Sequence, residues 1–155
     1  NAYSLFSGES KMNETKESLH YLLMANHLMV QKSLITSVKD TGLTPGQPKV
    51  LDYLRHHDGT VQKEIAANCH IEPASLTTIL NGMEAKGLIQ RRLCPDNHRF
   101  YNVYLTELGL TYVERLENEF DTIESHALQN FSETEKEQLI EYLSRIYSQM
   151  LGYNR

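Results

Sequence analysis

A chain of 155 residues, 40% of them hydrophobic and 23% charged, has the composition of a folded globular protein, which excludes a fibrous or wholly disordered chain. No apolar run approaches the roughly 20 residues that a membrane-spanning helix needs, and no secretory signal pattern opens the chain, so we expect a cytoplasmic protein with no membrane partner. The net charge of −5 argues against nucleic acid for the chain as a whole, but residues 60–104 hold five cations and four acids, so this segment carries +1.

The first part of the chain predicts two helices. Apolar residues recur at helical spacing over about residues 13–39, and Gly42 follows as a natural helix end. The second helix is predicted to open with Thr44 as its N-cap and Pro45 as its first helical residue, and to end near residues 57–59. Both helices are amphipathic, so each is expected to bury one face.

The middle of the chain predicts two short helices joined by a tight turn. Thr60 is the expected N-cap of the first of these helices, which ends near Cys69. Pro73 is the expected first residue of the second, which runs to about Lys86 and is terminated by Gly87. The residues that we expect on its buried face are Leu76, Ile79, Leu80 and Met83.

A hairpin and two long helices are predicted to follow. Residues 88–93 and 100–105 have the composition of strands, and residues 94–99 between them favour a turn, which predicts a β-hairpin with a long tip. Thr106 is the expected N-cap of a long helix. The last helix is predicted to start at residues 132–135, which have the spacing of a capping box.

This order of elements predicts a mostly α fold with a small β-hairpin: a winged helix-turn-helix with long N- and C-terminal dimerisation helices. We divide the chain into an N-terminal dimerisation helix at residues 1–40, a winged helix-turn-helix DNA-binding domain at residues 43–106, and C-terminal dimerisation helices at residues 107–155. The apolar stripes of the terminal helices present more apolar surface than one chain is expected to bury. A second copy is therefore the expected partner, giving a homodimer.

The second of the two short helices has the exposed face of a major-groove reader. Between Pro73 and Gly82 it carries no charge, whereas a merely solvated helix face usually carries Glu and Lys. The residues of this helix that we expect to contact DNA are Ala74, Ser75, Thr77, Thr78 and Asn81.

The chemistry of these side chains suggests their roles. Asn81 is suited to pair with an adenine edge or to hold a phosphate. Thr77 and Thr78 are suited to donate to phosphate or to contact a thymine methyl group. The amides of Ala74 and Ser75 stand at a helix N-terminus, where phosphate binds readily, although Ser75 can equally be only a first-turn helix residue.

The predicted hairpin supplies the cations of the expected DNA-binding surface. Arg91 and Arg92 are adjacent on one strand and therefore point to opposite faces, so one is expected to face phosphate and the other to pair with an acid. His98 and Arg99 near the hairpin tip are expected to reach a minor groove or its phosphates. The alternative role of Arg99 is an ion pair with Asp96 that shapes the loop.

Several segments of the chain share their residues and spacing with one known family. They are residues 43–47 (LTPGQ), residues 60–66 (TVQKEIA), Thr77 and Leu80, residues 86–89 (KGLI), Arg91 and Arg92, and residues 103–109 (VYLTELG). In these segments the chain resembles the MarR (multiple antibiotic resistance regulator) family, in its second and third helices, its recognition helix, its first wing strand and the junction that closes the wing. The resemblance covers about residues 15–150.

The wing departs from the pattern of this family. The family wing usually reads Asp-Pro-x-Asp-Arg-Arg, whereas residues 94–99 read CPDNHR and keep only Pro95 and Arg99 of that pattern. The family often has an arginine after the recognition-helix threonine, at the position that Thr78 occupies in this chain. Two usual cations are therefore missing, which predicts either a lower affinity for DNA or an affinity that depends partly on the protonation of His98.

The resemblance implies a sequence-specific DNA-binding transcriptional regulator. We expect a repressor that binds a pseudo-palindromic double-stranded operator as a homodimer and is released by a small-molecule effector. Such regulators bind the effector between the DNA-binding lobe and the dimerisation helices. The candidate lining residues of that cleft are Tyr21, Met24 and His27, for which packing in the core is the alternative role.

Two other interpretations of the sequence stay open. One is a winged-helix protein-interaction adaptor that lacks DNA binding, and the other is a redox-sensing regulator that uses Cys94, which lies beside Arg92 on the wing. Two cysteines make no disulfide framework, so free thiols are expected. The chain has no phosphate-binding glycine loop, nucleophile elbow or metal-ligand spacing, so we expect no enzymatic activity, cofactor or metal.

Overall fold

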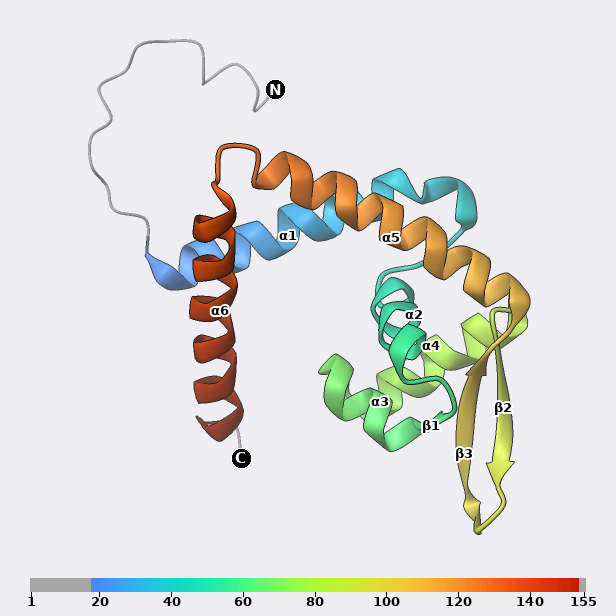
Figure 1. The fold of residues 1–155 in the computed structure, drawn as a ribbon. Coiled ribbons are helices and arrows are strands. Elements are labelled where there is room, and N and C mark those ends of the chain that lie inside the picture. Colours follow the sequence, from blue (N-terminus) through green and yellow to red (C-terminus); the bar gives the residue numbers. More distant parts are fainter. Residues whose placement is uncertain (1–17, 154–155) are drawn as a thin grey trace.

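The computed structural model describes residues 18–153, and Figure 1 shows their arrangement. The elements are α1 Leu19–Ser37, η2 (a 3-10 turn) Lys39–Thr41, α2 Gln47–His56, β1 Thr60–Val61, α3 Gln62–Cys69, α4 Pro73–Ala85, β2 Ile89–Cys94, β3 Asn97–Leu105, α5 Glu107–Ala127 and α6 Glu133–Tyr153. The predicted fold class, a mostly helical winged helix-turn-helix, is confirmed. The expected start of the first helix near Asn13 lies outside the described residues.

The hydrophobic core lies where α2, α3 and α4 meet the sheet. Leu51 and Leu54 of α2, Ile65 of α3 and Leu80 of α4 are fully buried there. The predicted buried face of α4 is confirmed, with Leu76, Leu80 and Met83 buried and Ile79 packed partly buried against the same cluster. This core holds α4 by one side only, so its opposite side is free to face a partner.

The second helix begins later than the sequence predicted. It starts at Gln47 rather than at Pro45, and Gly46 precedes it with φ at +94°, a backbone conformation that side chains disfavour. The buried Gln47 closes the turn instead of Thr44: its Oε1 accepts from the Thr44 amide at 3.1 Å and from Lys86 Nζ at 2.8 Å. The expected N-cap at Thr44 was therefore wrong, because a long-range contact to the end of α4 shapes this turn.

The residue expected to cap the third helix, Thr60, lies in a strand instead. β1 pairs antiparallel with β3, with Thr60 opposite Val103 and Val61 opposite Asn102, and the strand order of the sheet is β1-β3-β2. Helix α3 begins one residue after Val61. Two residues are too short for any alternation of polar and apolar side chains, so the sequence carried no signal of this strand.

The hairpin is also tighter than the sequence predicted. Strands β2 and β3 are joined by Pro95 and Asp96 alone, and Cys94 is paired with Asn97 across the turn. The register shifts between Leu93 and Cys94. His98 and Arg99 therefore lie on β3 near the tip rather than in a long loop.

The predicted caps of the two C-terminal helices are confirmed. The Thr106 hydroxyl accepts from the Gly109 amide at 3.0 Å at the start of α5. At the start of α6, the Ser132 hydroxyl accepts from the Glu135 amide at 3.2 Å while the Glu135 carboxylate accepts from the Ser132 amide at 2.8 Å, a reciprocal capping box.

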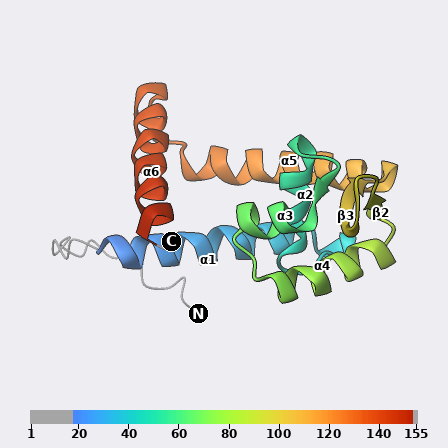
Figure 2. The same cartoon turned by 90° about the horizontal axis from the view of Figure 1, so that it is seen from below.

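Helix α6 stands at the end of the molecule opposite to the wing. Figures 1 and 2 show it apart from the α2–α4 core, at the far end of the arms formed by α1 and α5. It buries no residue, and a hydrogen bond of 3.0 Å between His70 Nε2 and the Tyr147 hydroxyl joins it to the turn after α3. In residues 18–153 no helix combines the length and the apolar character that crossing a membrane requires.

Candidate nucleic-acid interface

The side of α4 that faces away from the core carries the five residues of this helix that were predicted to contact DNA. Its first exposed residues are small, Ala74 and Ser75, and they follow Pro73 at the N-terminus of the helix. Thr77, Thr78 and Asn81 are exposed on the next two turns. The structure therefore brings these five residues to one surface and buries none of them.

The hydroxyl of Thr77 is already engaged within the protein. It donates to the Pro73 carbonyl at 3.1 Å and accepts from Gln62 Nε2 at 2.8 Å. Gln62, the first residue of α3, is thereby drawn to the edge of the α4 face. Sequence reasoning missed Gln62, because a glutamine in a first helical turn carries no sign that it contacts a helix eleven residues later.

The two wing arginines divide as expected, with one of them paired to an acid. Arg91 donates from Nε to Glu84 Oε2 at 2.7 Å and from Nη2 to Asn81 Oδ1 at 2.7 Å, and only 22% of its side chain is exposed. Arg92, on the other face of β2, is exposed; it donates to Gln90 Oε1 at 3.1 Å and lies 4.7 Å from the centre of the Tyr104 ring. A phosphate contact by Arg92 stays a prediction.

A hollow of about 470 Å³ separates the wing from the two short helices. Residues of α3, α4 and β3 line it, among them Gln62, Lys63, Thr77, Arg99 and Tyr101. The cations Lys63 and Arg99 thus stand on either side of a concave surface. Among the described residues, Arg99 forms no ion pair with Asp96, and its backbone amide donates to Asn97 Oδ1 at 3.1 Å instead.

The three candidate cleft residues on α1 do not line a common hollow. A second hollow, of about 200 Å³, lies between α1, the turn before α2, α2 itself and Phe120 of α5, and His27 lines it. Tyr21 and Met24 do not line this hollow. Their side chains are 53% and 64% exposed, so the predicted alternative role, packing in the core of their own chain, is wrong for both. Lys49 and Asp52 of α2 also border it, and sequence reasoning did not find them.

Both cysteines are free, and their surroundings differ. Cys69 is buried at the end of α3, and desolvation raises the pKa of its thiol to about 11. Cys94 is half-buried at the end of β2. In the part of the chain that the structure describes, no three His, Cys, Asp or Glu side chains gather as a metal site.

The exposed uncharged α4 face, the antiparallel wing and the cationic hollow between them define a winged helix-turn-helix protein of the nucleic-acid-binding type. A family model described as the MarR family matches residues 43–100, which span α2 to the start of the wing's second strand. Over these residues the chain is similar to the MarR family.

Proteins of similar sequence are described as transcriptional regulators. The chain is 30% identical over 106 residues to an uncharacterized HTH-type transcriptional regulator, YdgJ, of Bacillus subtilis, a match that covers 68% of this chain and 65% of that protein. It is 29% identical over 108 residues to a putative transcriptional regulatory protein for the hcr operon of Thauera aromatica, covering 70% of this chain and 65% of that protein. The chain thus matches about 65% of the length of these relatives.

Solved structures of similar proteins include complexes with DNA. The transcriptional repressor CouR, bound to a 23-mer DNA duplex, is 28% identical with a TM-score of 0.78, over 90% of this chain and 99% of that chain. MepR of S. aureus, solved as a DNA complex, is 27% identical with a TM-score of 0.76, over 86% of this chain and 96% of that chain. Both structures share the fold over nearly their whole length.

Proposed function

We propose that this chain is a sequence-specific DNA-binding transcriptional regulator that acts on a double-stranded operator. The observation that carries the proposal is the exposed α4 face, which is uncharged from Pro73 to Gly82 and flanked by the cationic hollow of the wing. The DNA-bound structures of the similar proteins CouR and MepR support it. The proposal assigns no enzymatic activity to the chain.

In this proposal α4 enters the major groove and the wing contacts the neighbouring backbone. The residues in contact with DNA are Ala74, Ser75, Thr77, Thr78, Asn81, Arg92, His98 and Arg99, with Arg91 placed behind Asn81. Residues 43–106 form the DNA-binding domain. Because Arg91 is paired with Glu84, Arg92 and Arg99 are the wing cations left to meet phosphate, together with Lys63 across the hollow.

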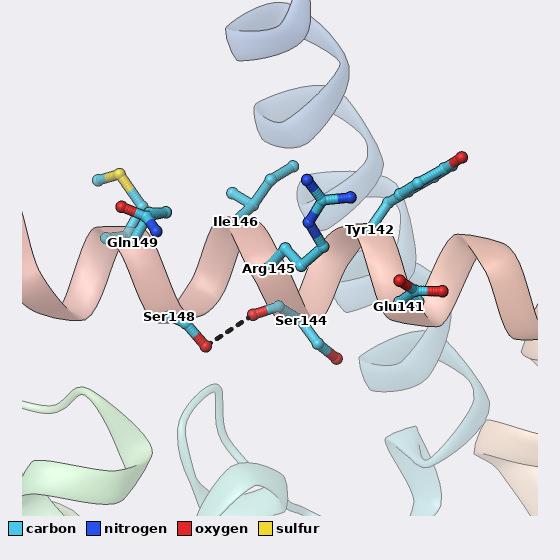
Figure 3. A pocket seen from close by; sticks show the side chains of 8 residues that line it. Glu141, Tyr142, Ser144, Arg145, Ile146, Ser148 and Gln149 are labelled. Atoms are coloured by element: carbon cyan, nitrogen blue, oxygen red, sulfur yellow. Dashed lines mark hydrogen bonds between the residues drawn. The ribbon is translucent and has the colours of Figure 1, made fainter.

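The same proposal makes the protein a homodimer. Figure 3 shows a hollow lined entirely by side chains of α6, so this surface is open in one chain. Apolar residues exposed on α1 and α6 include Leu22, Leu23, Met29, Leu143, Tyr147 and Met150. A second copy that covers them would use residues 1–40 and 107–155 as dimerisation segments, and its two-fold symmetry suits a pseudo-palindromic operator.

We also propose that a small molecule in the hollow beside His27 releases the protein from DNA. The hollow touches both α1 and α2, so a ligand there contacts a dimerisation helix and the DNA-binding domain at once. The similar protein CouR is named a transcriptional repressor, which supports repression as the mode of action.

A DNA-binding assay on the α4 face tests the proposal. The full chain is titrated at low salt against labelled duplexes from the region upstream of its own gene, and we expect a specific complex that weakens steeply as salt rises. Thr78→Glu places a carboxylate on the proposed groove-facing surface, so we expect binding to weaken at least about tenfold.

The matched control is Thr134→Glu, the same change at an exposed threonine in the first turn of α6, where an acidic residue is favourable. We expect this variant to bind as the wild type does. A wild-type protein that shifts none of these duplexes at low salt would favour the adaptor. Oxidant-dependent release that Cys94→Ser abolishes would favour the redox-sensing regulator.

A further inference from the structure

A short network of polar side chains joins the recognition helix to the first strand of the wing. Arg91 on β2 donates from Nη2 to Asn81 Oδ1 at 2.7 Å and from Nε to Glu84 Oε2 at 2.7 Å. Asn81 and Glu84 stand one turn apart on α4, so a single guanidinium spans both side chains. The pair with Glu84 is charge-assisted, and the guanidinium is largely covered, so Arg91 is held in place.

The chemistry of this contact determines which way the Asn81 amide is turned. A guanidinium carries only donors, so the atom of Asn81 that faces Arg91 must be the carbonyl oxygen, the only acceptor of that side chain. The amide nitrogen lies on the other side of the same planar group. No other hydrogen bond is formed by the Asn81 side chain within residues 18–153, so its two N–H donors remain available on the exposed surface.

We propose that Arg91 is a positioning residue that makes Asn81 a donor-only reader of DNA, selecting a base whose major-groove edge offers acceptors alone. Guanine presents N7 and O6 and thymine presents O4, and all of these accept from an amide nitrogen. Adenine pairs with asparagine through both its N7 and its N6 amine, and the amine would have to share the amide oxygen with Arg91, which already donates to it at 2.7 Å. The inference rests on the proposed function, and it replaces the adenine pairing suggested by the sequence.

The position of Asn81 on α4 is suited to this role. It is exposed on the same side of the helix as Ala74 and Thr78, seven and three residues earlier, while its neighbour Leu80 is fully buried. The other residues of α4 from Pro73 to Gly82 are uncharged, and the charges of Arg91 and Glu84 beside the amide are paired with each other. Base selection at one operator position therefore depends on a residue of the wing strand that need not touch that base.

Selection from a library of randomised double-stranded DNA tests the inference with the full chain. Comparing the wild type with Asn81→Ala identifies the base position that depends on Asn81, and we expect guanine or thymine there, favoured over adenine by about tenfold. Arg91→Met keeps an unbranched side chain that resembles the aliphatic part of arginine but removes its donors, which frees the amide to turn. We expect adenine to become accepted at that position in Arg91→Met and to be rejected again in Arg91→Lys, whose ammonium has only donors.

The matched control is Arg92→Met, the same change on the other face of β2. We expect it to weaken binding to all sequences alike and to leave the base preference unchanged. Adenine at the Asn81-dependent position of the wild type, or an unaltered preference in Arg91→Met, would overturn the inference. So would a uniform loss of affinity in Asn81→Ala with no base position affected, since that marks a phosphate contact.

The comparison of the wild type with Asn81→Ala does not require Arg91→Met to fold, so the inference stays testable without that variant. A wild-type protein that retains no duplex from the library overturns the proposed function, and this inference with it. DNA retained with the wrong base at the Asn81-dependent position overturns the inference alone.

Discussion

Single residues of the candidate interface are defined by the atoms that their neighbours leave free. The Thr77 hydroxyl already donates to Pro73 and accepts from Gln62, so it has no free donor for phosphate. The Asn81 oxygen already accepts a hydrogen bond from Arg91, so a base would have to share it. The residue type determines which hydrogen bonds a side chain can form, and its partners in the fold determine which of these hydrogen bonds remain available for DNA.

Asp40 provides a residue-scale test of pH dependence. Hydrogen bonds from Arg115, at 3.0 and 3.1 Å, hold the pKa of this carboxyl below its usual 3.8. A depressed pKa stabilises the fold above 3.8, and this stabilisation is lost as the pH falls through the lower pKa of the folded state. We expect Asp40→Asn to lower the urea midpoint at pH 7, and the difference from the wild type to shrink toward pH 3 and below.

The control for this experiment is Asp121→Asn, an exposed carboxylate on α5 that takes part in none of the ion pairs described between residues 18 and 153. Its midpoint is expected to follow the wild type at each pH when all proteins are compared at one concentration. A gap for Asp40→Asn that stays constant with pH would contradict the assignment.

At the scale of elements, the start of α5 is pressed against the wing. The Thr106 amide donates to the Leu88 carbonyl at 3.0 Å, and the Thr106 hydroxyl donates to the Gly87 carbonyl at 2.6 Å. Gly109, one turn into α5, is buried against the same Leu88 carbonyl oxygen, so close that a Cβ there would clash with backbone. This contact fixes the start of α5 against the residues that lead into the wing.

Gly109→Ala tests that contact. Alanine favours a helix over glycine by about 1 kcal/mol, but the clash with backbone cannot be relieved by turning a side chain. We expect a net loss of about 1–3 kcal/mol in the free energy of unfolding, measured by urea denaturation. Gly152→Ala is the matched control, because a Cβ there meets nothing within 4 Å, and it is expected to be neutral or slightly stabilising.

A Gly109→Ala variant as stable as its Gly152→Ala counterpart would show that the α5 junction is looser than described. The wild-type junction also explains why Gly109 belongs to the family-like segment at residues 103–109. A helix that begins directly against a strand end needs a residue without a side chain at this point.

Buried apolar residues are unevenly distributed over the molecule. Residues of α2, α3, α4 and the sheet close a core, whereas α6 buries nothing and α1 exposes large apolar residues along most of its length. Figure 2 shows α6 at the end of the molecule away from the wing, with α1 running from there to the core. A chain built in this way needs something to cover its far end, and a second copy is the occupant that we propose.

Leu143→Glu tests this assembly. Leu143 is 41% exposed within the apolar stripe of α6, so a charge there costs little in one chain but a great deal in a buried interface. We expect size-exclusion chromatography with light scattering to give a dimer for the wild type and a monomer for the variant. Thr134→Glu, an exposed position in the first turn of α6 that does not line the hollow of Figure 3, should remain dimeric, and a monomeric wild type would contradict the proposed assembly.

The sequence by itself determined the parts of the protein that depend on local periodicity. The helical stripe of α4, the Thr106 cap and the capping box of Ser132 and Glu135 could be predicted because each involves residues no more than a few positions apart. The same is true of the uncharged α4 face, which was visible as the absence of charge between Pro73 and Gly82.

Only the tertiary structure decided which distant residues meet. Strand β1 forms because β3 lies beside it, and the start of α2 moves because Lys86 reaches Gln47. Tyr21 and Met24 are left outside the hollow that His27 lines, and Arg91 turns toward Asn81. These contacts join residues that are separated in the chain or lie on different elements, and no spacing pattern records them, because they depend on how the folded elements pack together.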